Sequence, residues 1–163
     1  MAAGSTYTPI ATTTLGSATN TVTFSSITAS YTDLYLIVVG AASSSTTGVN
    51  LQFNADTGSN YSRTVLYGTG SVAGSARGSN AIQIGTGTFS TSQSVARINI
   101  MNYSNSTTYK TILARTDAAS VELLATVGLW RSTSAINEVK VISDSGINFI
   151  TGSTFTLYGI AAA

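Results

Sequence analysis

The sequence predicts an all-β protein, a single antiparallel β-sandwich of jelly-roll-like type with about ten short strands. Three observations support this prediction. Short apolar segments recur at a spacing of roughly 8–12 residues and are separated by Gly, Ser, Asn and Asp. Apolar and polar residues alternate within most segments, which is the period of a half-buried strand. Ile, Val, Leu, Phe and Tyr are also too frequent for a disordered chain.

The chain is the size of one domain. It has 163 residues, which is enough to bury a core, and no shift in composition divides it. We therefore expect one sandwich domain over residues 1–163, with a flexible leader at 1–6 and a short tail at 161–163.

Three strands are predicted in the N-terminal part. Residues 7–14 form an edge strand, because Pro9 has no N–H to offer to a neighbour and is tolerated at an edge. Residues 21–24 alternate cleanly. Residues 33–40, DLYLIVVG, are almost uniformly apolar, which favours a strand covered on both faces.

The clearest strand, turn, strand unit lies at 51–68, after a Ser/Thr/Gly loop at 41–48. Strand 51–53 leads into a polar turn at 54–60, and alternation resumes over 61–68, so the unit is predicted to be a hairpin. Asp56 and its neighbours offer oxygen atoms but lack the spacing of a calcium loop, so we interpret them as a turn.

The rest of the chain is predicted to form further strands after one loop. A Gly/Ser-rich connection that carries Arg77 is expected at 69–80. Region 117–130 could begin as a helix capped by Asp117, but the period-2 spacing of its apolar residues favours a strand. The other predicted strands are 81–84, 94–102, 109–116, 137–142 and 154–160.

Composition excludes several functional classes. The chain has no Cys, which removes disulfides and thiolate sites, and no His, the commonest general base and metal ligand. A net charge of +1 with scattered Lys and Arg gives no field for nucleic acid. The N-terminus does not resemble a signal peptide, and the longest apolar run, 34–39, is too short for a bilayer, so we expect a product made in a cytoplasm without membrane partners.

The balance of charge and hydropathy indicates assembly. Only 8% of the residues are charged, and the mean hydropathy is +0.26. A monomer with few charges would expose apolar surface with little colloidal repulsion. We therefore expect a homo-oligomer.

Catalytic chemistry has little support. Two carboxylates in one cleft are the minimum for glycoside hydrolysis, and Asp117 with Glu122 or Asp144 is the most suitable pair. The Asp residues, however, stand beside Gly, Ser or Thr, where they typically cap backbone donors. We expect no enzyme activity and no catalytic, cofactor-binding or metal-binding residues.

Aromatic and basic residues near strand ends are the candidate contacts. Such side chains stack on sugar rings or pack at protein interfaces, and their types do not separate these partners. The alternative is that Trp130 plugs the edge of the sandwich while the tyrosines cover margins of the core. The candidate contact residues are Tyr61, Arg63, Tyr67, Tyr103, Tyr109, Trp130 and Arg131.

Four segments together resemble a family of small structural proteins of tailed phages, common in marine and cyanobacterial phages. They are LQFNADTGSNYSRTVLYG (51–68), INIMNYSNSTTYKTILAR (98–115), VGLWRSTSAINEV (127–139) and GSTFTLYGI (152–160). The resemblance covers about residues 7–160.

The resemblance implies a β-sandwich that assembles on a virion, with no catalytic role. We expect an oligomeric capsid decoration or cement protein, a trimer that binds other virion proteins. The alternative is a tail-fibre or receptor-binding module whose aromatic residues recognise a host glycan.

Overall fold

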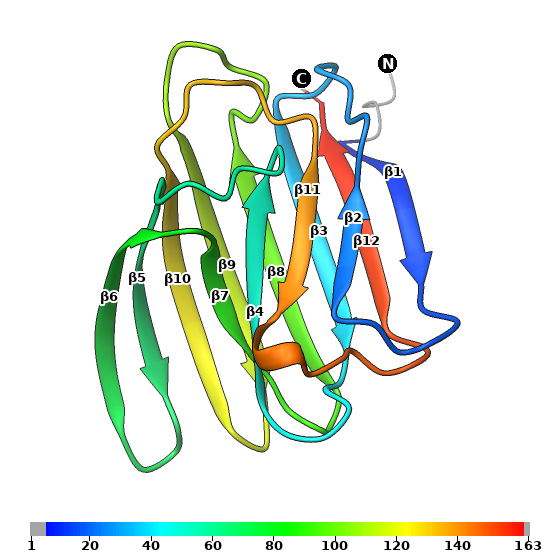
Figure 1. Cartoon of the computed structure of the whole chain (residues 1–163), viewed down its shortest axis with the longest axis vertical. Helices are drawn as coiled ribbons and strands as arrows, with labels where there is room; N and C mark the ends of the chain where they lie inside the picture. The colour runs from blue at the N-terminus through cyan, green and yellow to red at the C-terminus, as the bar shows by residue number, and fades with distance from the viewer. Residues whose placement is uncertain (1–5, 162–163) are drawn as a thin grey trace.

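A computed structural model describes residues 6–161 as two antiparallel β-sheets packed face to face (Figure 1). The larger sheet contains, in spatial order, β1 (Tyr7–Thr14), β12 (Thr154–Ile160), β3 (Asp33–Gly40), β8 (Ser94–Met101), β9 (Lys110–Ala118), β10 (Glu122–Trp130), β5 (Tyr61–Gly68) and β6 (Ala73–Ala81). The smaller sheet contains β2 (Thr21–Phe24), β11 (Val139–Ser143), β4 (Thr47–Phe53) and β7 (Ile84–Phe89).

The predicted all-β sandwich is therefore confirmed, with twelve strands in the described residues instead of about ten. The only helix in this part of the chain is one 3-10 turn, η1 (Asp144–Gly146), so no helix there could span a membrane. Jelly-roll topology stays a prediction. The expected leader and tail lie almost wholly outside the described residues.

The core lies between the sheets. Apolar side chains from both sheets interdigitate there, including Phe53, Phe89 and Phe155, all of which are fully buried. In β3, Leu34, Leu36 and Val38 point into this core, while the residues between them are partly exposed. The prediction that residues 33–40 are covered on both faces is therefore wrong, because residues 6–161 form no second layer over the outer face of the larger sheet.

The predicted 51–68 hairpin is also wrong. Its two strands exist, but β4 pairs with β11 and β7 in the smaller sheet, whereas β5 pairs with β10 and β6 in the larger one. The 54–60 loop therefore crosses from one sheet to the other. Alternation shows which side chains are buried but does not identify the strand that supplies the hydrogen bonds, so sequence reasoning paired the two nearest neighbours.

Another correction concerns the region after β5. The predicted connection at 69–80 is largely the edge strand β6, and the predicted strand at 81–84 spans the turn between β6 and β7. The Gly, Ala and Ser residues of β6 have low intrinsic strand preference. The ladder with β5 holds them in strand conformation, and their pairing becomes irregular near Ala81.

Several other predictions are confirmed. Strand β1 is an edge strand with Pro9 beside a register shift, and β2 has the predicted bounds. Region 117–130 forms no helix, and it consists of the end of β9, a turn and the strand β10. The predicted strands at 94–102, 109–116, 137–142 and 154–160 correspond to β8, β9, β11 and β12 within a few residues.

Candidate interaction surface

The outer face of the larger sheet carries exposed apolar side chains on β5, β9 and β10. Leu66, Leu113, Leu123 and Val127 are between 42% and 61% exposed. Strand register places Leu66 opposite Ala125, and Leu113 opposite Val127. We call Leu66, Leu113, Leu123, Ala125 and Val127 the outer patch. Contiguous exposed apolar residues of this kind are typical of an interaction site.

The outer patch exists because β10 buries its small and polar residues. Gly128 faces inward, where a Cβ atom would lie 2.6 Å from Ile84 Cγ2 and 2.7 Å from Ile112 Cγ1. Thr126 also faces inward and donates to the carbonyl oxygen of Thr86. Strand β7 thus approaches β10 closely, and the apolar stripe with Leu123 and Val127 is left on the solvent side.

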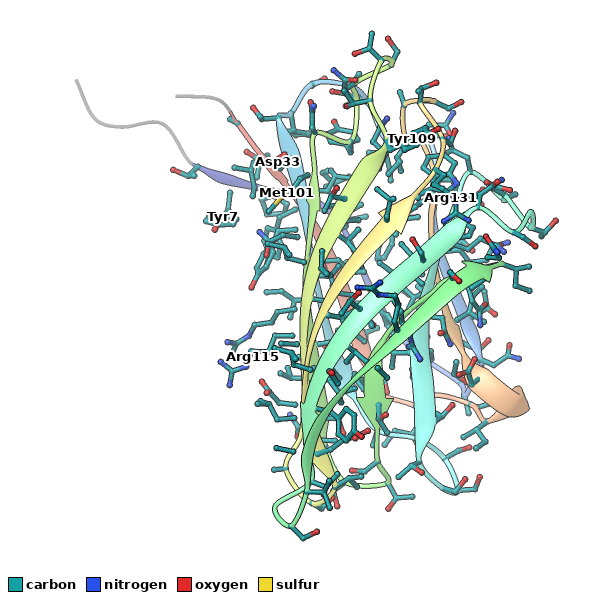
Figure 2. All side chains as sticks on the ribbon, turned by 90° about the vertical axis from the view of Figure 1, so that its left-hand side faces the viewer. Tyr7, Asp33, Met101, Tyr109, Arg115 and Arg131 are labelled. Carbon is teal, nitrogen blue, oxygen red and sulfur yellow. The ribbon has the colours of Figure 1, made fainter. Side chains whose placement is uncertain are left out.

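Charged residues border the outer patch on β8 and β9. Arg115 points away from the sheet (Figure 2), and its Nε atom lies 3.1 Å from Oδ1 of Asp117. Arg97 stands directly opposite Arg115 in the register. A cavity of about 480 Å³ at the end of the patch is lined by Arg115, Asp117 and Glu122.

This cavity brings together one of the two carboxylate pairs considered from the sequence. Asp117 and Glu122 both line it, although Asp117 is already paired with Arg115. Asp144 lies elsewhere, in η1, where its Oδ1 atom accepts hydrogen bonds from Asn50 and Gln83. Among the described residues, no group of three or more acidic side chains could hold a metal ion.

Two of the predicted contact residues, Tyr61 and Trp130, belong to the core. Tyr61 is fully buried and Trp130 is 2% exposed, and their rings stack with centroids 6.3 Å apart. The Tyr61 hydroxyl donates to the carbonyl oxygen of Asp56 and accepts from the N–H of Phe53. Burial raises the pKa of Tyr61 to about 12. Neither ring can meet a partner, so both are corrected to structural residues.

Asp56 closes this cluster from the 54–60 loop. Its carboxylate accepts hydrogen bonds from Trp130 Nε1 at 2.6 Å, from Asn60 Nδ2 and from the N–H of Gly58. Burial acts to raise the pKa of Asp56, but these donors outweigh it and lower that pKa below the usual value of 3.8. The interpretation of this segment as a turn therefore agrees with its hydrogen bonds.

Tyr103 is a third correction. Its ring is fully buried, and its hydroxyl donates to the carbonyl oxygen of Thr28 and accepts from the N–H of Tyr31. Burial raises the pKa of the Tyr103 hydroxyl. This side chain anchors the segment between β2 and β3, and it is not available to a partner.

The other candidates lie nearer to solvent but do not form one site. Arg63 points to the inner side of β5, where its Nη1 atom occupies the space that a side chain at Gly85 would need. Tyr67 is half-buried, with its hydroxyl over Gly74. Tyr109, which is 54% exposed, and Arg131 lie at the same end of the molecule (Figure 2).

Sequence reasoning missed the outer patch. The period-2 stripe through Leu123 and Val127 was visible, and it favoured a strand, but such a stripe normally marks the buried face. The sign that it faces outward is Gly128 with Thr126 on the opposite face, since small and hydroxylated residues permit close approach of another strand.

Comparisons with known proteins leave this chain without an assigned family. No family model matches it, and no curated protein matches it. Among solved structures, a mutant of the alginate lyase Aly36B in complex with an alginate tetrasaccharide has a TM-score of 0.35 and 10% identity, over 91% of this chain and 77% of that one. A TM-score this low does not establish a shared fold, so nothing about this chain is inferred from it.

Proposed function

We propose that the chain is a structural protein that associates with copies of itself through the outer patch. The observation that carries this proposal is the adjacency of Leu66, Leu113, Leu123 and Val127 on an uncovered sheet face. Burying a half-exposed leucine contributes about 1 kcal/mol, and each copy would bury several such side chains.

The occupant we propose for the patch is a second copy of the same chain. The patch itself contains no charged residue, and Arg115 at its border is already paired with Asp117. A neutral apolar surface of this kind complements itself without juxtaposing like charges. One patch meeting its own copy closes a two-fold dimer, so the expected trimer needs a further contact surface.

The setting we propose is a virion, in which the protein decorates or cements the capsid. Support for this setting is the resemblance of segments 51–68, 98–115, 127–139 and 152–160 to structural proteins of tailed phages. A structural role needs a rigid sandwich and a surface that binds other subunits, and it does not need a catalytic cleft. The alternative of a glycan-binding tail fibre relied on the aromatic residues, and it is weakened because the rings of Tyr61, Tyr103 and Trp130 are buried.

A matched pair of charge substitutions tests the assembly. Leu113→Asp places a charge in the outer patch, whereas Ile150→Asp places one at a residue of similar exposure outside it. We expect sedimentation velocity to show that Leu113→Asp dissociates the oligomer and Ile150→Asp does not. A wild-type protein that stays monomeric at every concentration would refute self-association.

A reconstruction of the intact particle tests the setting. We expect density for this sandwich between coat subunits on the outside of the capsid. Density confined to the tail would exclude the decoration role while leaving self-association through the outer patch intact.

A further inference from the structure

A groove of about 400 Å³ lies beside the outer patch, where β10, β5 and β6 run next to one another. Hydroxyl side chains line it from three strands, namely Ser62 and Thr64 of β5, Ser79 of β6 and Thr111 of β9. Val127 and Leu129 add apolar surface. The groove thus combines hydrogen-bonding groups with a patch of hydrocarbon.

The charged side chains that line the groove are all positive. Arg77 and Arg131 line the groove, and none of the described residues that line it is acidic. In a chain with seven basic and six acidic residues, such a local excess does not follow from composition. The side chain of Arg77 is exposed and has no hydrogen-bond or ion-pair partner among the described residues.

The fold holds Arg131 in place at one end of the groove. Its Nη2 atom donates to the carbonyl oxygen of Ser59 at 2.7 Å and to Oδ1 of Asn80 at 3.1 Å. Asn80 can accept this bond because the ladder between β5 and β6 is irregular there and Asn80 has a φ of 55°. Bulges commonly re-aim side chains near functional sites. Arg131 is therefore oriented before any ligand arrives.

We propose that this groove binds an acidic saccharide. A guanidinium recognises a carboxylate or sulfate through paired hydrogen bonds, and the side chain of Arg77 can offer such a pair. Arg131, whose Nη2 protons are already donated, adds its positive charge and its remaining N–H groups. The Ser and Thr hydroxyls complement sugar hydroxyls, while Val127 and Leu129 complement the C–H face of a ring. None of the described residues that line the groove is an aromatic on which bases could stack, so a nucleic acid fits it less well.

This inference does not depend on self-assembly. Val127 is the only residue that the groove shares with the outer patch. The test uses the full chain, with polygalacturonate as an acidic polymer, dextran as a neutral polymer and oligo(dT) as a nucleic acid. Binding of each is measured by biolayer interferometry at low salt, and sedimentation velocity is run on the same samples.

We expect wild-type protein to bind polygalacturonate and neither of the other polymers. Arg77→Ala should raise the dissociation constant about tenfold, because it removes one charged contact. Lys140→Ala is the matched control, since it removes the same charge from β11 in the other sheet and should leave binding unchanged. Arg131→Ala, checked for folding by thermal melting, should weaken binding at least as much as Arg77→Ala.

Three results would overturn the proposal: no binding of polygalacturonate, equal binding of dextran or oligo(dT), or equal loss in Arg77→Ala and Lys140→Ala. An oligomer that forms normally but does not bind polygalacturonate would refute saccharide binding by the groove and leave the assembly intact. A monomer that binds normally would refute the assembly alone.

Discussion

At the scale of single residues, Trp130 and Asp56 show how a side chain that suggests ligand binding can serve the fold. Trp130 lies at a strand end beside Arg131, which is where aromatic residues often meet sugars. Its indole instead packs on Phe53 and Tyr61, and its only polar atom donates to Asp56. The cluster joins the crossing loop to both sheets, so it stabilises the fold.

Asp56→Asn should make unfolding less dependent on pH. The lowered pKa of Asp56 means that its charged form stabilises the folded state above the usual value of 3.8, and that this contribution is lost as the pH falls from there through the folded-state pKa. We expect the variant to lose about 1 kcal/mol at pH 7 and the difference to vanish in acid. Urea unfolding from about pH 2 to about pH 7, a range that brackets carboxyl titration, measures the difference in free energy of unfolding between the two proteins. Parallel pH profiles for the two proteins would contradict the role given to this carboxylate.

Gly128→Ala should destabilise the protein, whereas Gly68→Ala should not. A Cβ atom at Gly128 would contact Ile84 and Ile112 below 3 Å, but one at Gly68 meets nothing within 4 Å. Because cores resist overpacking, we expect Gly128→Ala to cost about 1–3 kcal/mol in the free energy of unfolding. Equal stability of the two variants would show that β7 does not pack closely against β10 at Gly128.

At the scale of elements, β7 determines which face of β9 and β10 becomes the core. Its ladder with β4 skips Thr86, so the Thr86 carbonyl oxygen has no place in the regular register. The hydroxyls of Thr116 on β9 and Thr126 on β10 both donate to that oxygen. Two strands of the larger sheet are thus oriented by one irregularity in the smaller sheet.

A double-mutant cycle with Thr116→Val and Thr126→Val tests this shared acceptor. Either single variant leaves one hydroxyl on the Thr86 oxygen, so each should cost about 1 kcal/mol. The double variant leaves a buried carbonyl without a donor and should cost more than the sum. Denaturant unfolding measures all four proteins. Strict additivity would mean that the two hydroxyls act independently.

At the scale of the whole molecule, the larger sheet presents two surfaces of different chemistry on one face. The outer patch is apolar and lies over β5, β9 and β10. The groove lined by Arg77 and Arg131, which we call the arginine groove, adjoins it over β10, β5 and β6. The side-chain view from the edge of the sandwich shows no layer of described residues over this face (Figure 2). Assembly and ligand binding would therefore use the same side of the protein.

Salt should separate these two activities. Apolar association does not weaken when charges are screened, whereas contacts between arginine and an exposed anion do. Raising NaCl from about 0.05 to 0.5 M should leave the sedimentation coefficient unchanged and abolish most polygalacturonate binding. Dissociation of the oligomer by salt would indicate an interface built from ion pairs such as that of Arg115 instead of from the outer patch.

The class of fold and the position of most strands were predictable from local sequence patterns. Alternation in segments such as 21–24 and 94–102 depends on local pleat geometry, which any strand must obey whatever its partner. The polar turn around Asp56 was predictable for the same reason, because its hydrogen bonds join near neighbours. The absence of Cys and His likewise removed whole classes of chemistry before any folding was considered.

Strand partners, and the side of each strand that faces solvent, depend on long-range packing in the tertiary structure. Pairing of β4 with β7 and of β5 with β10 brings together residues far apart in the chain, and local periodicity carries no information on such contacts. Burial of Tyr61 and Trp130 and exposure of Leu123 and Val127 depend on which layer lies above each strand. The outer patch and the arginine groove arise from that arrangement, because their residues come from separate strands that meet only in the folded sheet.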